Sequence, residues 1–249
     1  MNNYFETQGH YDRGNYANSS YPSASGALTF SGVMTRVYLW MTAALMLTAG
    51  AALITASSPA LLNLIFGNQA IVWILFGGEL ALVMGISWGI NRLSPTMATA
   101  LFLLYSVVNG VTLSSIFFAY SLGSITQAFA ASALTFGAMS VLGFTIKRDL
   151  SGLGGILMMA LIGLIIASVV NIFWSNSVLD AIVTYVGVFL FVGITAYDTQ
   201  RIKQMSEIAE TSGDAAAPRR VAILGALSLY LDFINLFLYI LRLFGRGRD

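Results

Sequence analysis

Long apolar stretches separated by short polar breaks make up most of the sequence after its first thirty residues. A helix of about 20 apolar residues, rising 1.5 Å per residue, crosses a hydrocarbon core of about 30 Å. A soluble helical bundle would instead show polar stripes at helical spacing, and these stretches have none. The pattern predicts an all-α integral membrane protein with seven transmembrane helices, at approximately residues 33–56, 70–90, 96–118, 126–146, 154–174, 181–204 and 222–244.

The beginning of the chain has a different composition. Residues 1–30 are rich in Asn, Ser, Tyr and Gly, and they lack the apolar run behind a basic start that marks a cleaved signal peptide. They also lack the apolar surface that would offset the entropy of ordering. We therefore expect a disordered polar tail in residues 1–30 and a single transmembrane domain in residues 31–249.

Lysine and arginine alternate between the connections of the predicted helices. The first, third and fifth connections have neither residue, and Arg36 lies at the start of the first helix. Basic connections stay in the cytoplasm, so the amino terminus is predicted to be cytoplasmic. The basic residues of the second, fourth and sixth connections and their flanks are Arg92, Lys147, Arg148, Arg201, Lys203, Arg219 and Arg220.

The end of the chain conflicts with this orientation. Seven crossings place Arg242 and the arginines after it on the outer side, whereas a re-entrant last segment would keep them inside. Residues 222–244 are mostly apolar, with Asp232 near their middle, and they contain no Pro or Gly pair that would turn the chain back. A last helix that spans the membrane is therefore the preferred interpretation.

Composition and charge narrow the function further. The chain is 57% hydrophobic and 9% charged, whereas a soluble domain has about 25% charged residues. Its formal net charge of +1 argues against a nucleic-acid surface. The absence of cysteine excludes disulfides and thiolate sites, and His10 as the single histidine excludes a His-rich metal cage. We expect no cofactor.

Three acidic residues fall inside predicted spans: Glu79 in the second, Asp198 late in the sixth and Asp232 in the seventh. An ionisable group at membrane depth costs several kcal/mol unless it is paired or hydrated, so each is a candidate functional residue. The two aspartates share a depth only if the sixth helix continues to about Glu207. Residues 201–208 contain good helix formers and no helix breaker, which allows such an extension.

Packed side by side, the sixth and seventh helices would bring Asp198 and Asp232 together. Like charge and desolvation would then disfavour ionising both, and the pair would share one proton. Such a pair serves as a pH sensor, and when ionised it offers oxygen ligands to a cation such as Ca²⁺. Structural alternatives are that Arg201 neutralises an interfacial Asp198, and that Glu79 only hydrogen-bonds a neighbouring helix through a residue such as Asn109 or Asn171. Asp180 is expected at the interface.

Three segments resemble motifs of the Bax inhibitor-1 family, also called the transmembrane Bax inhibitor motif family. They are Ala-Tyr-Asp-Thr-Gln at 196–200, Leu-Tyr-Leu-Asp-Phe-Ile-Asn-Leu-Phe at 229–237 and Lys-Arg-Asp-Leu-Ser at 147–151. The resemblance extends over residues 33–244 and is strongest to the bacterial branch. It implies a seven-helix fold whose last helix is central and surrounded by the other six.

The resemblance also implies a function, which is a pH-sensitive calcium leak across the membrane. Carried over by motif, Asp198 and Asp232 are the proton-sensing pair and Glu79 is the acidic residue of the second helix. An arginine at the cytoplasmic end of that helix pairs with the sixth-helix aspartate in the family, and here Arg92 is the nearest candidate for this latch. The implied setting is a multi-pass protein of the bacterial inner membrane, a monomer whose partners are lipid, calcium and protons.

Two other classes of function remain open. Intramembrane aspartyl proteases also carry two aspartates on consecutive helices, and Tyr197-Asp198 matches their first motif. Their second motif, Gly-x-Gly-Asp, is absent, because Leu229-Tyr230-Leu231 precedes Asp232. We therefore expect no enzymatic activity. The other alternative is a non-transporting scaffold that binds membrane-protein partners and uses the aspartates only for helix packing.

Overall fold

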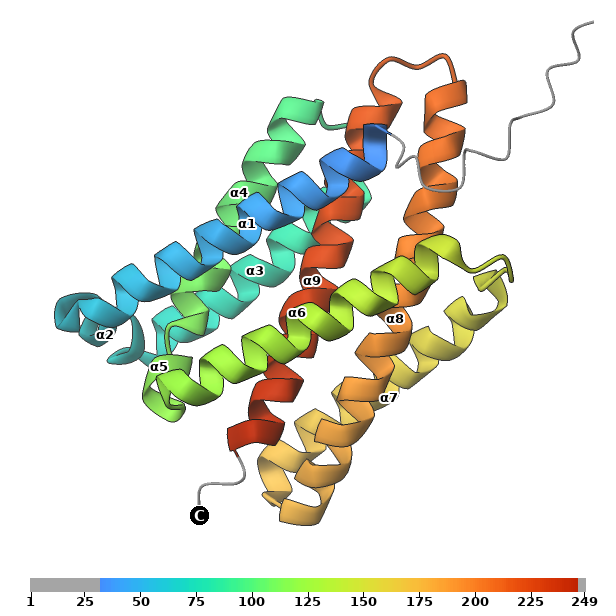
Figure 1. The fold of residues 1–249 in the computed structure, drawn as a ribbon. Coiled ribbons are helices and arrows are strands. Elements are labelled where there is room, and N and C mark those ends of the chain that lie inside the picture. The colour runs from blue at the N-terminus through green and yellow to red at the C-terminus, as the bar shows by residue number, and fades with distance from the viewer. Residues whose placement is uncertain (1–31, 246–249) are drawn as a thin grey trace, which may run out of the picture.

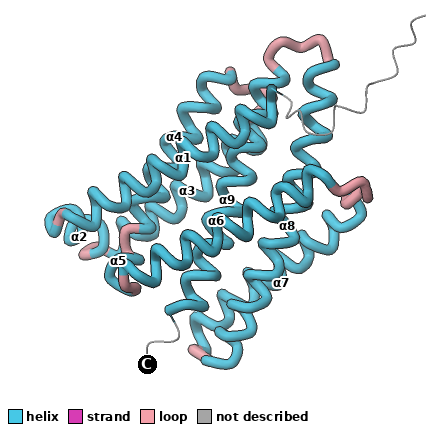
Figure 2. Tube along the Cα trace, in the orientation of Figure 1, coloured by secondary structure: helices cyan, strands magenta, loops and turns pink. Residues whose placement is uncertain are grey.

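The computed structural model describes residues 32–245, and the predicted polar tail lies outside the described residues. The described part is helical and contains no strand. Figure 2 shows its helices joined by short loops. Their bounds are α1 Gly32–Ser57, α2 Pro59–Phe66, α3 Gln69–Gly89, α4 Pro95–Leu113, α5 Ile116–Ala119, α6 Leu122–Thr145, α7 Gly154–Trp174, α8 Ser177–Thr211 and α9 Ala217–Gly245.

Seven of the helical segments in residues 32–245 are long and apolar enough to cross a membrane, which confirms the predicted all-α architecture. Two details differ from the expected spans. The first connection contains α2, a short helix that the pattern did not predict, and α8 continues to Thr211 instead of ending near Gln204. The last segment is one unbroken helix, as spanning requires.

Polar residues define where several helices begin. The side chain of Ser94 accepts a hydrogen bond from Met97 N (3.2 Å), and Ser121 accepts one from Ser124 N (3.1 Å). Asn176 accepts from the first amides of α8 in the same way. Each acceptor satisfies an amide that has no partner inside its own helix, so these residues start α4, α6 and α8.

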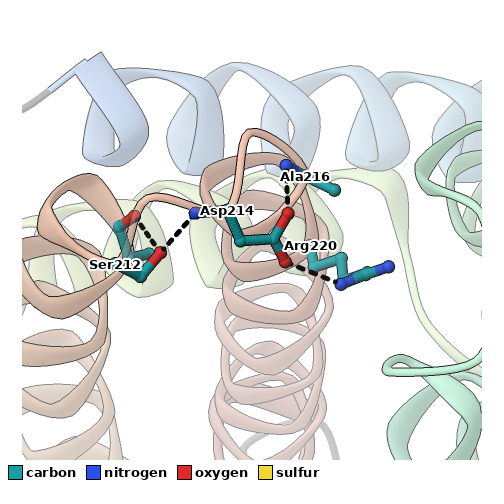
Figure 3. Close-up of polar contacts among 5 residues, drawn as sticks. Ser212, Asp214, Ala216 and Arg220 are labelled. Carbon is teal, nitrogen blue, oxygen red and sulfur yellow. Dashed lines mark hydrogen bonds and ion pairs between the residues drawn. The ribbon is translucent and has the colours of Figure 1, made fainter.

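The α8–α9 connection reverses the chain direction. Gly213 has a φ of +75°, a left-handed conformation that suits glycine. Asp214 then accepts a hydrogen bond from Ala216 N (2.8 Å) and pairs with Arg220 Nη1 (3.2 Å), as Figure 3 shows. These contacts close the turn from which α9 starts, and they set α8 and α9 antiparallel.

Helix α9 runs through the middle of the bundle (Figure 1) and packs against α1, α4, α6 and α8. In its most apolar stretch 67% of the residues are buried, against 11% for α3 and 6% for α7. Those two outer helices pack mainly on α4 and α8, respectively. The core around α9 includes Tyr230, whose ring meets those of Phe102 and Tyr105 edge-on at 5.8 and 5.7 Å.

Large apolar side chains point outward from the bundle. Trp88 is 78% exposed, and Phe173 and Trp174 at the end of α7 are similarly exposed. In water such a surface would drive association, whereas in a bilayer it faces lipid tails. The outward face therefore agrees with a membrane environment for the described helices.

Candidate functional site

A cavity of about 820 Å³, lined by α3, α4, α7, α8 and α9, reaches into the bundle and is partly open at its edge, where Leu80 of α3 and Met158 of α7 are exposed. Glu79 of α3, Asp198 of α8 and Asp232 of α9 all contribute to its wall. The structure thus brings together the three acidic residues that the sequence placed in different spans. Most of the remaining wall is apolar, including Phe76, Leu161 and other side chains of α3 and α7.

Asp232 is the most deeply buried of the three carboxylates, with 5% of its surface exposed. Its Oδ2 atom is buried and has no hydrogen-bond partner among the described residues. Asp198 is close enough to act on it electrostatically. Asp232 would therefore either bind a proton and be neutral, or be ionised with a cation nearby to offset its charge.

Asp198 lies on α8, opposite Ser228 of α9. Ser228 donates a hydrogen bond to Asp198 Oδ2 with an Oγ–Oδ2 distance of 2.5 Å. Arg201, one helical turn further along α8, lines the same cavity and contributes positive charge near Asp198. Because α8 continues to Thr211, the extension that would allow Asp198 and Asp232 to share a depth is present.

Glu79 is held by two side chains of α4. Thr112 Oγ1 donates to Glu79 Oε1 (2.5 Å) and Asn109 Nδ2 donates to Oε2 (3.2 Å). Asn109 Oδ1 in turn accepts from Tyr230, whose hydroxyl also meets Thr48 Oγ1 at 2.7 Å. The hydrogen bond to Asn109 proposed from the sequence is thus present, while Asn171 instead lies near Asp180. Glu79 belongs to a polar network that joins α1, α3, α4 and α9.

A second, smaller cavity of about 240 Å³ extends toward the α8–α9 connection. Its wall includes Ser87 and Met205, together with Asp198, Arg201 and Ser228. The last three residues also border the larger cavity. These three residues therefore lie between the larger cavity and the end of the bundle that carries most of the basic connections.

Arg92, the candidate latch, is exposed in the turn that follows α3, where its amide donates to Gly89 O at 2.8 Å. Among the described residues it borders neither of the two cavities that contain Asp198. Arg201 is the arginine that the structure places in this site. A latch role for Arg92 stays a prediction.

Two hydroxyl residues of the site were not anticipated. Ser228 precedes Asp232 by four residues and Thr112 follows Asn109 by three, spacings that put each pair on one helix face. This spacing could have suggested both residues. Their partners Asp198 and Glu79 lie 30 and 33 residues away in sequence, so the spacing alone could not have named the contacts.

The carboxylates of the site do not make up a complete metal-binding shell in the described part of the chain. In the described part of the chain no group of three or more Asp, Glu, His or Cys side chains is arranged to hold a metal ion. Ca²⁺ usually takes six to eight oxygen ligands, which Asp198, Asp232 and neighbouring hydroxyls do not supply by themselves.

The fold and the site define a class of protein, a polytopic helical membrane protein with a cluster of carboxylates inside its bundle. Residues 30–249 match the family model described as "Inhibitor of apoptosis-promoting Bax1". The chain belongs to the Bax inhibitor-1 family. It is 51% identical to the inner membrane protein YbhL of Escherichia coli K12 over 215 residues, which cover 86% of this chain and 92% of that protein.

Two further relatives extend the comparison to distant bacteria. An uncharacterized protein of Deinococcus radiodurans is 44% identical over 216 residues, covering 87% of this chain and 90% of its own length. An uncharacterized membrane protein of Streptococcus pyogenes serotype M6 is 43% identical over 169 residues, covering 68% of this chain and 72% of its own. The similarity to YbhL and to the Deinococcus protein extends over almost the whole transmembrane domain.

Proposed function

We propose that this protein is a pH-sensitive calcium leak channel of the bacterial inner membrane, gated by protonation of Asp198 and Asp232. The observation that carries the proposal is the single cavity that these two aspartates share with Glu79 inside a membrane-spanning bundle. Ionisable groups at membrane depth are typical of ion and proton pathways. The resemblance to the Bax inhibitor-1 motifs supplies the ion and the pH sensitivity.

The two aspartates are the first part of the proposed gate. They lie within electrostatic range of each other, and Asp232 has a buried oxygen without a hydrogen-bond partner in the described structure. Ionising both in a low-dielectric interior is costly, so a proton or a cation would occupy the pair. Proton binding shifts the bundle between closed and open arrangements only if the two arrangements differ in proton affinity.

Arg201 is the second part of the proposed gate. Its charge lies close to Asp198, at the boundary between the small and the large cavity. An ionised Asp198 would attract Arg201, and a protonated Asp198 would release it toward the interface, because a long basic side chain can extend its charge to water. The movement would change the width of the path between the two cavities.

The basic residues at the end of the bundle that carries the α8–α9 connection indicate how the protein is oriented in the membrane. The α3–α4, α6–α7 and α8–α9 connections and their flanks carry Arg92, Lys147, Arg148, Arg219 and Arg220. The positive-inside rule therefore supports a cytoplasmic position for this end and for the amino terminus. With this orientation the smaller cavity is the cytoplasmic approach to Asp198.

Calcium flux into proteoliposomes across a pH series tests the proposal. Native protein should give a pH-dependent flux above that of empty liposomes, and Asp198→Asn and Asp232→Asn should each flatten the dependence. Asp149→Asn is the matched control, because Asp149 lies in the exposed α6–α7 connection outside both cavities.

Absence of native flux at every pH would overturn the leak and favour the scaffold alternative. The aspartate variants would then show their effect in assembly instead of flux. A peptide-cleavage assay on the same preparations covers the remaining class of function. Turnover that depends on Asp198 would indicate an aspartyl protease instead.

A further inference from the structure

Tyr239 of α9 borders two separate cavities. One is the large cavity that contains the carboxylates. The other, of about 290 Å³, lies near the α7–α8 turn at the opposite end of the bundle from the α8–α9 connection, and Asp180 and Arg242 line it. A side chain that forms part of both walls lies between the two spaces.

Close contacts hold the Tyr239 ring in this position. A Cβ atom built at Gly187 of α8 would lie 2.5 Å from Tyr239 Cε1, so only a glycine leaves room for the ring. The Phe191 ring stacks on it with centroids 5.8 Å apart and an angle of 26° between the planes. The ring therefore fills the interface between α8 and α9 at this level.

The far cavity has polar walls that can hold water. Arg242 Nη1 lies 3.6 Å from Asp180 Oδ1, and both side chains are partly exposed. Asn171 Nδ2 lies 3.5 Å from the same oxygen, and the guanidinium of Arg242 lies 5.9 Å from the Tyr239 ring centroid. Charged groups thus lie on both sides of Tyr239, with the carboxylates on one side and the Asp180–Arg242 pair on the other.

We propose that Tyr239 is the gate residue that closes the ion path between the large cavity around Glu79, Asp198 and Asp232, here the carboxylate cavity, and the cavity beside Asp180 and Arg242, here the outer cavity. This inference rests on the proposed leak function. An aromatic ring between two polar spaces is a hydrophobic constriction, and such constrictions block ions by excluding water. Turning the ring away from Gly187 and Phe191 would join the two cavities. Asp180 and Arg242 would then form the outer mouth.

A readout that does not depend on flux is thiol accessibility. The chain has no cysteine, so Asn235→Cys introduces a single thiol into the carboxylate cavity one helical turn before Tyr239. A membrane-impermeant methanethiosulfonate with a quaternary ammonium group is added to the outer face of spheroplasts. Ser168→Cys, in the outer cavity, is the positive control for labelling from that side.

The expected result is slow labelling of Asn235→Cys in the native background. Adding Tyr239→Ala should raise the rate about tenfold, as expected when a barrier falls by about 1.4 kcal/mol. Tyr239→Phe should leave the rate low because it keeps the ring. The matched control is Tyr185→Ala, two residues before Gly187 but on an exposed face of α8.

Two outcomes would overturn the gate. One is rapid labelling of Asn235→Cys with Tyr239 intact, and the other is an unchanged rate in Tyr239→Ala. If Tyr239→Ala does not fold, Phe191→Leu removes the stacked ring instead and should give a smaller increase in the rate; no increase would count against the gate.

Calcium flux separates failure of the gate from failure of the leak. If both hold, Tyr239→Ala raises flux above the native level at every pH where the native protein conducts. Native flux that Tyr239→Ala leaves unchanged would reject the gate alone. If neither the native protein nor Tyr239→Ala gives flux, the leak is rejected. The labelling rate of Asn235→Cys would then report only whether Tyr239 closes the cavity to the outer face, without any ion transport.

Discussion

Ser228 of α9 donates a 2.5 Å hydrogen bond to Asp198 of α8, and this contact joins the two helices that carry the aspartates. Ser228→Ala should therefore displace the pH midpoint of calcium flux. A hydrogen bond to a charged group contributes about 1.5–3 kcal/mol, which corresponds to a displacement of about one to two pH units.

The control is the same substitution in a chain that already carries Asp198→Asn. There Ser228→Ala should have no further effect on the pH profile, because the carboxylate it would act on is absent. Equal displacements in the two backgrounds would show that Ser228 acts through something other than Asp198.

Tyr230 connects the Glu79 network to α1, through hydrogen bonds with Asn109 and Thr48. Tyr230→Phe keeps the ring and removes the hydroxyl, so the free energy of unfolding should fall by about 0.5–2 kcal/mol, the range measured for interhelical hydrogen bonds in membranes. Steric trapping or denaturant unfolding in bicelles measures the change. Tyr185→Phe, on an exposed face, should change the free energy by less than about 0.5 kcal/mol.

Gly143 of α6 sets the distance between α6 and α8. A Cβ at this position would clash with the carbonyl oxygen of Ala196, a backbone atom that cannot move aside alone. Gly143→Ala should therefore lower the free energy of unfolding by about 1–3 kcal/mol, the usual range for overpacking.

The matched control lies on the same helix. A Cβ at Gly137 would have no neighbour within 4 Å, so Gly137→Ala should be neutral or slightly stabilising. Thermal unfolding of the two variants in one detergent makes the comparison. Equal loss of stability would show that helix propensity, not the approach of α6 to α8, determines the effect.

Asp149 provides a pH prediction outside the membrane-spanning helices. The Ser151 hydroxyl and amide donate to Asp149 Oδ1 at 2.6 and 2.9 Å, and these hydrogen bonds lower the pKa of its carboxyl below the ordinary value. Because the pKa of Asp149 is lower in the folded protein than in the unfolded chain, its ionised carboxylate stabilises the folded connection at pH values above the unfolded-state pKa. This stabilisation is lost as the pH falls through the folded-state pKa.

Asp149 therefore stays ionised throughout the neutral range. Asp149→Asn should leave the pH profile of calcium flux between about pH 5 and 8 unchanged in shape. A carboxyl ¹³C titration should show Asp149 titrating below 3.8, the ordinary value for aspartate. A midpoint above that value would contradict the hydrogen-bonded geometry of this connection.

Some of the site followed from local sequence and some did not. Asp232 was identifiable because one carboxylate interrupts a continuous apolar run, and a bilayer makes such an interruption costly. The sequence identifies Arg201 only as a neutralising neighbour of Asp198, whereas the continuation of α8 to Thr211 places its side chain in the wall of the site. Tyr239 looked like any other aromatic residue in a span, because its role depends on what α7 and α8 place around it.

By itself the sequence determined the all-α membrane architecture and the identity of the buried carboxylates. Both depend on the exclusion of water from the bilayer, which requires long apolar helices and makes each charge stand out. Only the tertiary structure decided that Glu79, Asp198 and Asp232 share one cavity, that Ser228 and Arg201 border it, and that Tyr239 lines both this cavity and the one beside Asp180 and Arg242. Those contacts join residues on different helices, and their distances depend on how the helices pack.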